Sequence, residues 1–436
     1  MRRMWSRHPA GFAFFWLCSL IFAVVPMLQL RHGSWAPPDY QTVYSSAGCL
    51  LHGCDPYNSD ALLQEYLRST DGTPPSPDSS AFIPYQSLYP PSSLFWLSAF
   101  SLFPWKVALP LWMAANILLF LAAAVLIADI CVDFENSLSL FLLSVFVATS
   151  TVLVSTGQPS SMAISLCTIG AWFFLRDRSI WLGCLCLGLS LAIKPQTGWL
   201  VVLYFLLVSR SRPRRVALLV IATVLCLAPG LLWAAQSPVA SNWPHSVATN
   251  IAGSTLPGNA NDPTVKNVTS DMIVDLQAII AVFSESPRIY NSGAYLVAAA
   301  LSLVWVNTTL RQRGSRPEYL FGTAAAACLC LLPIYHRTHD IRLLVLIFPA
   351  SAWLIDQGRR RAIAGAFLPA AVILLSHPNF LREHLHLQAQ LLAPVAALFL
   401  LRASALTVLA GAIFYLSWFV RLQRDPAEQM ERRRVT

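Results

Sequence analysis

GFAFFWLCSLIFAVVPMLQL, residues 11–30, is a run of twenty residues without a charged side chain. A helix that crosses the roughly 30 Å hydrocarbon core of a bilayer needs about 20 apolar residues, so this run predicts a membrane-spanning helix. It follows Arg2, Arg3 and Arg7, and basic residues favour the cytoplasmic side. A signal peptide has a shorter apolar core and a small-residue cleavage site, whereas this run ends in Gln-Leu-Arg-His. We therefore expect a retained first helix with a cytoplasmic N-terminus.

The rest of the chain has the same character. Of its 436 residues, 56% are hydrophobic and 12% charged, compared with about 25% charged in soluble domains. We expect one integral membrane domain over residues 1–436, an all-α polytopic transmembrane bundle of about 11–13 helices. The further helices are expected over residues 88–103, 107–130, 138–155, 159–175, 180–193, 196–209, 216–235, 293–310, 319–334, 341–356, 362–376 and 388–420. The last run is long enough for two short spans, or for one span with an interfacial lead-in.

The connectors between apolar runs predict the orientation of the bundle. Five of them are basic and are expected in the cytoplasm: residues 176–178, 210–215, 311–316, 359–361 and the tail 421–436. Four are rich in Pro, Asn, Asp, His and aromatic residues and are expected outside: the long first outer loop 31–87, the second large outer loop 236–291, and the short loops 335–340 and 377–387. A simple count of spans before Arg176 gives the wrong parity. One segment within residues 88–155 is therefore expected to be re-entrant or tilted.

Net charge and cysteine content exclude several functions. The net charge of +9 lies in the connectors, where it sets orientation, so nucleic acid is not implied as a partner. Most of the ten cysteines lie in apolar runs, and no Cys/His spacing is typical of a zinc site. Cys49 and Cys54 fall in the first outer loop, where they could pair in an oxidising compartment or stay free.

Four polar elements remain near the membrane boundary once the connectors are explained. They are Asp39 in Pro38-Asp39-Tyr40, the turn Gly157-Gln158-Pro159, the segment Lys194-Pro195-Gln196, and the cluster Tyr335-His336-Arg337-Thr338-His339-Asp340-Ile341-Arg342. Each also has a simpler interpretation. Asp39 could cap a helix that starts at Tyr40, Lys194 could snorkel to the headgroups, Gln158 could bond backbone groups freed at the Gly-Pro break, and the cluster could be a solvated loop.

The charges of this set favour a chemical role. Lys194, His336 and Arg337 could bind a phosphate while Asp39 serves as a base, and all can be placed on the same outer face. That combination fits sugar transfer from a lipid-linked phosphate. The leaving phosphate needs cationic partners in a water-poor site, and the acceptor hydroxyl needs a carboxylate to take its proton. Such chemistry requires no nucleotide-binding glycine loop and no Asp-x-Asp pair, and the sequence contains neither. No cofactor and no metal is expected.

The motifs of the outer loops resemble those of glycosyltransferase family 87. Asp39-Tyr40, Tyr44, Asp55-Pro56-Tyr57 and Tyr89-Pro90-Pro91 resemble its first outer loop, and the Gly-Gln, Lys-Pro and Tyr-His-Arg motifs of residues 157–337 resemble its later ones. The resemblance implies a GT-C fold and inverting transfer from a polyprenyl-phosphate sugar, with Asp39 as base and His336 near the donor phosphate. Supporting roles are expected for Tyr40, Tyr89, Gln158, Gln196, His339 and Asp340. Ser160 stands where the family commonly has Asn, which weakens the case for a donor contact from this turn.

Two functions of different classes follow from these observations. The leading hypothesis is a membrane glycosyltransferase that moves a hexose, such as mannose, from a polyprenyl-phosphate donor to a lipid-linked or cell-envelope glycan. It would lie in a bacterial plasma membrane with its active site on the extracytoplasmic face. The alternative is a transporter or flippase of an anionic lipid-linked substrate. A transporter should show related halves or paired broken helices, and the sequence shows no convincing repeat.

Overall fold

The computed structural model describes residues 8–31, 37–70, 87–134, 136–209, 211–267, 269–375 and 394–424. The predicted loop 377–387 and residues 425–436 of the predicted tail lie outside this range. Within it, the chain consists of α-helices and short 3₁₀ segments without a named strand, so the predicted all-α polytopic bundle is confirmed.

Six helices in the described residues are long and apolar enough to cross a membrane, and the protein is therefore an integral membrane protein. They lie in α2 (Pro9–Arg31), α6 (Trp105–Cys131), α7 with η1 and α8 (Ser137–Ala148, Thr149–Thr151 and Val152–Ser155), α12 (Arg212–Gln236), α15 (Pro287–Arg311) and α21 (Ala403–Arg424). Three shorter apolar helices pack among them, α9 (Ser160–Leu175), α10 (Ile180–Ile193) and α11 (Pro195–Val208).

The other elements complete the bundle and its two ends. They are α3 (Pro38–His52), α4 (Ser59–Ser69), α5 (Pro91–Ser101), η2 (Pro238–Asn242), α13 (Trp243–Ser254), η3 (Ser270–Met272), α14 (Leu276–Ile280), α16 (Arg316–Cys330), η4 (Asp340–Ile347), α17 (Phe348–Ile355), α18 (Arg359–Leu375) and α20 (Pro394–Leu401). Of the two possibilities for residues 388–420, the described part shows a short helix followed by one long span.

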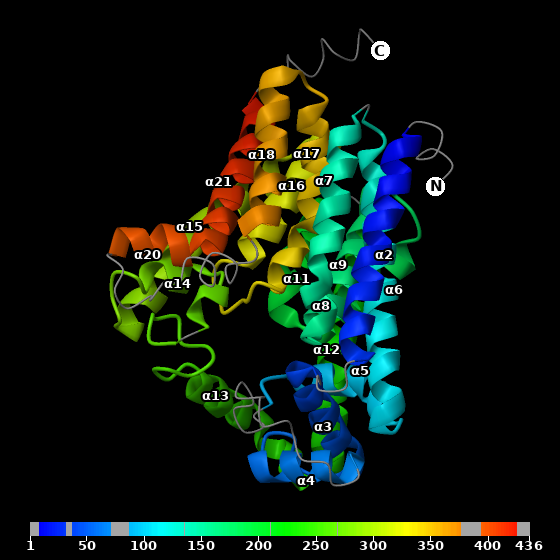
Figure 1. Cartoon of the computed structure of the whole chain (residues 1–436), viewed down its shortest axis with the longest axis vertical. Coiled ribbons are helices and arrows are strands. Elements are labelled where there is room, and N and C mark those ends of the chain that lie inside the picture. Colours follow the sequence, from blue (N-terminus) through cyan, green and yellow to red (C-terminus); the bar gives the residue numbers. More distant parts are fainter. Residues whose placement is uncertain are drawn as a thin grey trace.

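The basic connectors gather at one end of the bundle. Arg176 bonds to Asp129 and Asp133, and Arg316 also bonds to Asp133. Arg214 pairs in the same way with Asp177. We call this the basic end. In Figure 1 the start of α2 and the connection between α17 and α18 lie at one end, whereas α3 and α4 lie at the other. The helices α3 and α4 of the first outer loop therefore lie at the end opposite to the connector between α17 and α18.

Helix α5 explains the parity conflict. Its eleven residues rise about 16 Å, which is too short to cross a bilayer. Near its C-terminus, Ser101 Oγ donates to the carbonyl of Tyr44 in α3 (2.9 Å). Near its N-terminus, Ser92 Oγ donates to the carbonyl of Ala192, two residues before Lys194 (2.9 Å). Both ends of α5 thus contact the end of the molecule that carries α3, and α6 is the helix that returns to the basic end.

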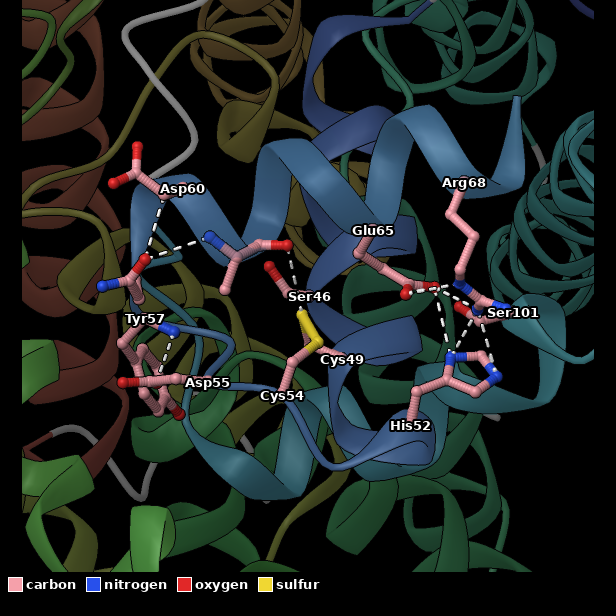
Figure 2. The surroundings of a disulfide bond; sticks show 12 residues. Ser46, Cys49, His52, Cys54, Asp55, Tyr57, Asp60, Glu65, Arg68 and Ser101 are labelled. Atoms are coloured by element: carbon pink, nitrogen blue, oxygen red, sulfur yellow. Dashed lines mark hydrogen bonds and ion pairs between the residues drawn. A yellow bond between two sulfur atoms is a disulfide. The ribbon is translucent and has the colours of Figure 1, made fainter. Parts of the chain in front are cut away.

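The first outer loop folds into a helical hairpin of α3 and α4. A disulfide joins Cys49 to Cys54 across the turn between them, as Figure 2 shows. Gly48 allows the two helices to approach, because a Cβ at this position would lie 2.6 Å from Glu65 Oε1. Glu65 in turn accepts hydrogen bonds from Arg68 (2.8 Å) and lies 3.2 Å from His52 Nδ1. These contacts hold the C-terminal part of α3 against α4, and Asp39 lies at the other end of α3.

Candidate functional site

Asp39 lies in the first turn of α3, and it does not cap this helix. Pro38 begins the helix, since its fixed φ and missing N–H suit the first position, and the cap position is Pro37. A side-chain hydrogen bond joins Asp39 to Gln158, and the charges of Arg337 and Lys194 act on its carboxylate. Burial nevertheless dominates and raises the pKa of Asp39 above its ordinary value. A carboxylate with a raised pKa is a better proton acceptor at neutral pH.

The Gly157-Gln158-Pro159 turn brings the Gln158 amide to Asp39. Gly157 has φ +69°, and a Cβ there would lie 2.7 Å from the Cβ atoms of Pro37 and Tyr40, so only glycine fits against the start of α3. The Tyr89 hydroxyl donates to Gln158 Oε1 (3.1 Å). Because an ionised carboxylate only accepts hydrogen bonds, the Gln158 amide nitrogen is the atom that donates to Asp39. The two residues orient the candidate base.

Lys194 occupies the break between α10 and α11. Its backbone is extended (φ −148°, ψ 87°), and Pro195 starts the next helix. Its Nζ donates to Ser160 Oγ (2.6 Å) and to the two carboxylate oxygens of Asp340 (2.7 and 3.0 Å). The lysine is buried, with 7% of its side chain exposed. It does not snorkel to solvent, and its charge is balanced within the protein.

Asp340 is the centre of the outer-loop cluster. Besides Lys194, its Oδ2 contacts His336 Nδ1 (3.0 Å) and accepts from the backbone N–H of Arg337 (3.3 Å). His339 Nε2 lies 3.7 Å from the same oxygen. Burial opposes ionisation of Asp340, but Lys194 and the neighbouring histidines hold its pKa well below the ordinary value. Burial lowers the pKa of His339 to about 3, so this ring is neutral at physiological pH.

Arg337 is a cation of this cluster that does not pair with a carboxylate in the described residues. Its guanidinium bonds to the hydroxyl of Tyr335 and donates to the carbonyl of Ala260 (2.7 Å). In the part of the chain that the structure describes, no carboxylate lies within 4.0 Å of it. Unlike Lys194, the residue is partly exposed. Arg337 is therefore the cation of this cluster that remains available to an anion.

The second outer loop holds the cluster in place. Val274 N donates to the carbonyl of His336 and Thr338 N to that of Met272, both at 2.9 Å. Asp275 caps α14 through the N–H of Ala278 (2.9 Å), and burial raises its pKa to about 6. This pairing of two loops about sixty residues apart fixes the position of His336.

The remaining predicted residues have different environments. Tyr40 is buried, and its ring stacks on Trp112 (4.6 Å between centroids) and Trp105 (5.4 Å), so it anchors α3 to α6. Gln196 is partly exposed in the first turn of α11, and no hydrogen bond of its side chain to the cluster is seen in the described residues. Sequence reasoning did not find Ser160, Asp275 or the buried Arg402, which donates to the carbonyl of Pro263 (2.7 Å) in the second outer loop.

The arrangement combines a partly exposed carboxylate of raised pKa, Asp39, with an available cation, Arg337. Asp39, Gln158 and Tyr89 come from the first outer loop and the 157–159 turn, and the charges of Lys194 and Arg337 reach Asp39 from two other elements. Such a site can take a proton from one substrate while it stabilises negative charge on another. No group of three or more His, Cys, Asp or Glu side chains suited to a metal ion occurs in the described ranges.

Comparison with known proteins identifies the family. The sequence model of glycosyltransferase family 87 matches residues 88–333, which is more than half of the chain. The match includes Tyr89, Gln158 and Lys194, whereas Asp39 and the 335–340 cluster lie outside it. No curated protein and no solved structure matches the chain. The chain belongs to glycosyltransferase family 87 and is a membrane glycosyltransferase.

Proposed function

We propose that this glycosyltransferase moves a hexose, with mannose as the first candidate, from a polyprenyl-phosphate donor to a lipid-linked or cell-envelope glycan. Asp39 takes the proton of the acceptor hydroxyl. Arg337 and His336 face the donor phosphate. Attack occurs on the side of the sugar opposite to the phosphate, so the anomeric configuration inverts.

One observation carries this proposal. Asp39, a partly exposed carboxylate with a raised pKa, is hydrogen-bonded by Gln158 and interacts electrostatically with Arg337. In a direct displacement the base and the leaving-group ligands must flank one reacting carbon, and a base on one side with a cation on the other supplies both. A covalent, retaining route would use a second carboxylate as nucleophile. Asp340, whose charge acts on Asp39, is already bonded to Lys194 and His336.

The position of the site supports a lipid-linked donor. Asp39 lies in α3, at the end of the bundle opposite to the connection between α17 and α18 (Figure 1), and six helices of the described residues are long and apolar enough to cross a bilayer. A polyprenyl chain can remain in the bilayer while its phosphate reaches Arg337. Since the basic connectors favour the cytoplasmic side, the site faces the extracytoplasmic side in this proposal, as expected for a bacterial plasma-membrane enzyme.

The test is donor use by the purified protein in nanodiscs. Polyprenyl-phosphate mannose, polyprenyl-phosphate glucose and GDP-mannose are each supplied with a membrane glycolipid extract as acceptor. We expect transfer from a polyprenyl-phosphate sugar, with release of polyprenyl phosphate, and none from the nucleotide sugar. A product with the configuration opposite to that of the donor supports inversion. Transfer from GDP-mannose alone would refute the proposed donor class.

A further inference from the structure

The donors of Lys194 are fully used within the protein. An ammonium group has three N–H donors, and Nζ has three oxygen partners within 3.0 Å: Ser160 Oγ and both oxygens of Asp340. Lys194 and Asp340 are both buried, with 7% and 1% of their side chains exposed. A phosphate could bind Lys194 only by displacing Asp340, which would leave a carboxylate buried without its counterion. The loss of one partner of a buried ion pair is strongly destabilising.

His336 contacts the pair of Lys194 and Asp340 through the Asp340 carboxylate. An ionised Asp340 can only accept hydrogen bonds, so the 3.0 Å contact requires that His336 Nδ1 carries the proton. The ring is fully buried, and its second nitrogen, Nε2, has no hydrogen-bond partner in the described residues. A buried polar atom without a partner is unfavourable, because it has lost its hydrogen bonds to water. Such an atom in a site is a binding position for a ligand.

Other charged groups surround the ring without contacting Nε2. Asp275 Oδ2 lies 3.4 Å from the backbone N–H of His336, and His339 lies beside Asp340. Lys194 approaches from the break between α10 and α11, and Arg337 is the next residue in the chain. The series of hydrogen bonds that starts at Ser160 and passes through Lys194 and Asp340 to His336 therefore ends at His336 Nε2, which has no partner in the described residues.

We infer that Lys194 and Asp340 are positioning residues: together they fix the tautomer of His336 that carries its proton on Nδ1, so that Nε2 is the atom offered to the sugar donor. Lys194 holds Asp340 ionised, and Ser160 holds Lys194. The pair does not contact the donor. This inference rests on the proposed function for the identity of the ligand, but the tautomer itself does not depend on it.

Two double variants isolate the effect. Lys194→Met with Asp340→Asn removes both charges but keeps a carbonyl oxygen that can accept from His336 Nδ1. Lys194→Met with Asp340→Leu removes both charges and the acceptor. Replacement of a buried ion pair by residues of similar volume is often tolerated, so both variants should fold. The matched control is Lys266→Met with Glu285→Gln, because that pair has the same 2.7 Å distance but is more than half exposed.

The first measurement is the tautomer of His336. In protein labelled with ¹⁵N-histidine, the His336 signals are assigned by their loss in His336→Gln. At a pH where the ring is neutral, we expect Nδ1 protonated in the parent, in the Asn double variant and in the control, and this preference lost in the Leu double variant. A parent ring protonated on Nε2 would overturn the inference, whatever the substrate is.

The second measurement is transfer and its inhibition by free polyprenyl phosphate. The Asn double variant should keep its inhibition constant within about threefold, whereas the Leu double variant should lose roughly 100-fold in kcat/KM relative to it. A loss of inhibition above about tenfold in the Asn double variant would mean that Lys194 contacts the phosphate, and it would refute the inference. If no polyprenyl-phosphate sugar is consumed by the parent, the proposed function fails while the tautomer result stands.

Discussion

The two ends of the bundle use the same ion-pair chemistry with opposite exposure. At the basic end, Arg176 bonds to Asp129 and Asp133, and the side chains are 14–34% exposed. At the other end, Lys194, Asp340 and His336 are 0–7% exposed. Partly exposed pairs are worth about 0–1 kcal/mol, whereas a buried pair is strongly destabilised when one partner is lost.

The difference indicates separate roles for the two ends. The basic end joins the connectors between helices and carries the charge bias that sets orientation. At the other end, among the residues that the structure describes, the Arg337 guanidinium has no carboxylate within 4.0 Å and His336 Nε2 has no hydrogen-bond partner. At the basic end, Arg214 Nε also lacks a hydrogen-bond partner in the described residues, but its guanidinium pairs with Asp177, which is 72% exposed, whereas His336 Nε2 belongs to a fully buried ring.

The largest effect on transfer is expected from replacing a carboxylate by an amide at Asp39, and the same change at the basic end should have little effect. Asp39→Asn should lower transfer about 100- to 10,000-fold, because the amide keeps the shape but cannot accept the proton. Asp177→Asn is the matched control, since Asp177 is 72% exposed at the basic end and Asn tolerates its positive φ. Its rate should stay within about threefold of the parent. The measurement is the steady-state rate of transfer from the proposed polyprenyl-phosphate sugar donor. If Asp39→Asn kept more than about a tenth of the parent rate, Asp39 would not be the base.

The pH dependence of stability should have opposite signs at the two ends. Burial raises the pKa of Asp275 to about 6. The free energy of unfolding that protonated Asp275 contributes is therefore fully present below the pKa of Asp in the unfolded chain, and it is lost as the pH rises through about 6. The shift of about two units corresponds to about 3 kcal/mol. Asp133 is also desolvated, but Arg176 and Arg316 lower its pKa below the ordinary value. Its contribution is present above the unfolded pKa and is lost on acidification.

Asp275→Asn and Asp133→Asn test these signs. Asn still caps α14 at position 275. Thermal unfolding in detergent from roughly pH 2 to 7 should show Asp275→Asn gaining stability relative to the parent as the pH rises towards 6, whereas Asp133→Asn should lose stability relative to the parent as the pH rises to about 4. If the unfolding temperatures of all three proteins changed in parallel with pH, folding would shift the pKa of neither Asp275 nor Asp133.

A smaller effect is expected for the available cation. Arg337→Ala should weaken inhibition by free polyprenyl phosphate by about 1.5–3 kcal/mol, the contribution of a charge-assisted hydrogen bond. Arg316→Ala is the control at the basic end, where the guanidinium is 51% exposed, and its inhibition constant should not change. An unchanged constant in Arg337→Ala would remove this residue from the phosphate site.

The sequence predicted the spans well because hydropathy follows burial in lipid. The predicted helix 107–130 is α6, Trp105–Cys131, and the predicted 293–310 lies within α15, Pro287–Arg311. The observed helices start earlier where proline begins a polar first turn, which an apolar pattern does not report. For the same reason α3 and α4 were expected only as a polar loop.

The site was predictable as a set of residues but not as a network. Lys194 and Asp340 are 146 residues apart, and no local periodicity brings them together. Their charges suggested a shared face, yet the sequence assigned Lys194 to a phosphate, whereas the structure pairs it with Asp340. Ser160 drew notice only as a departure from the family pattern. Its hydroxyl completes the coordination of Lys194 (2.6 Å), which depends on the distance between two helix ends.

The smallest effect should come from cysteines that report sidedness without disturbing either end. Asp60→Cys in α4, Thr255→Cys after α13 and Arg313→Cys at the basic end are all exposed and should leave transfer unchanged. The parent is the blank, because Cys49 and Cys54 are joined and the other eight cysteines are buried or partly buried. With a membrane-impermeant maleimide outside sealed right-side-out vesicles, positions 60 and 255 should label, and position 313 only after permeabilisation. Labelling of positions 60 and 313 from the same side would place the candidate site and the basic connectors on one face, and the proposed orientation would be wrong.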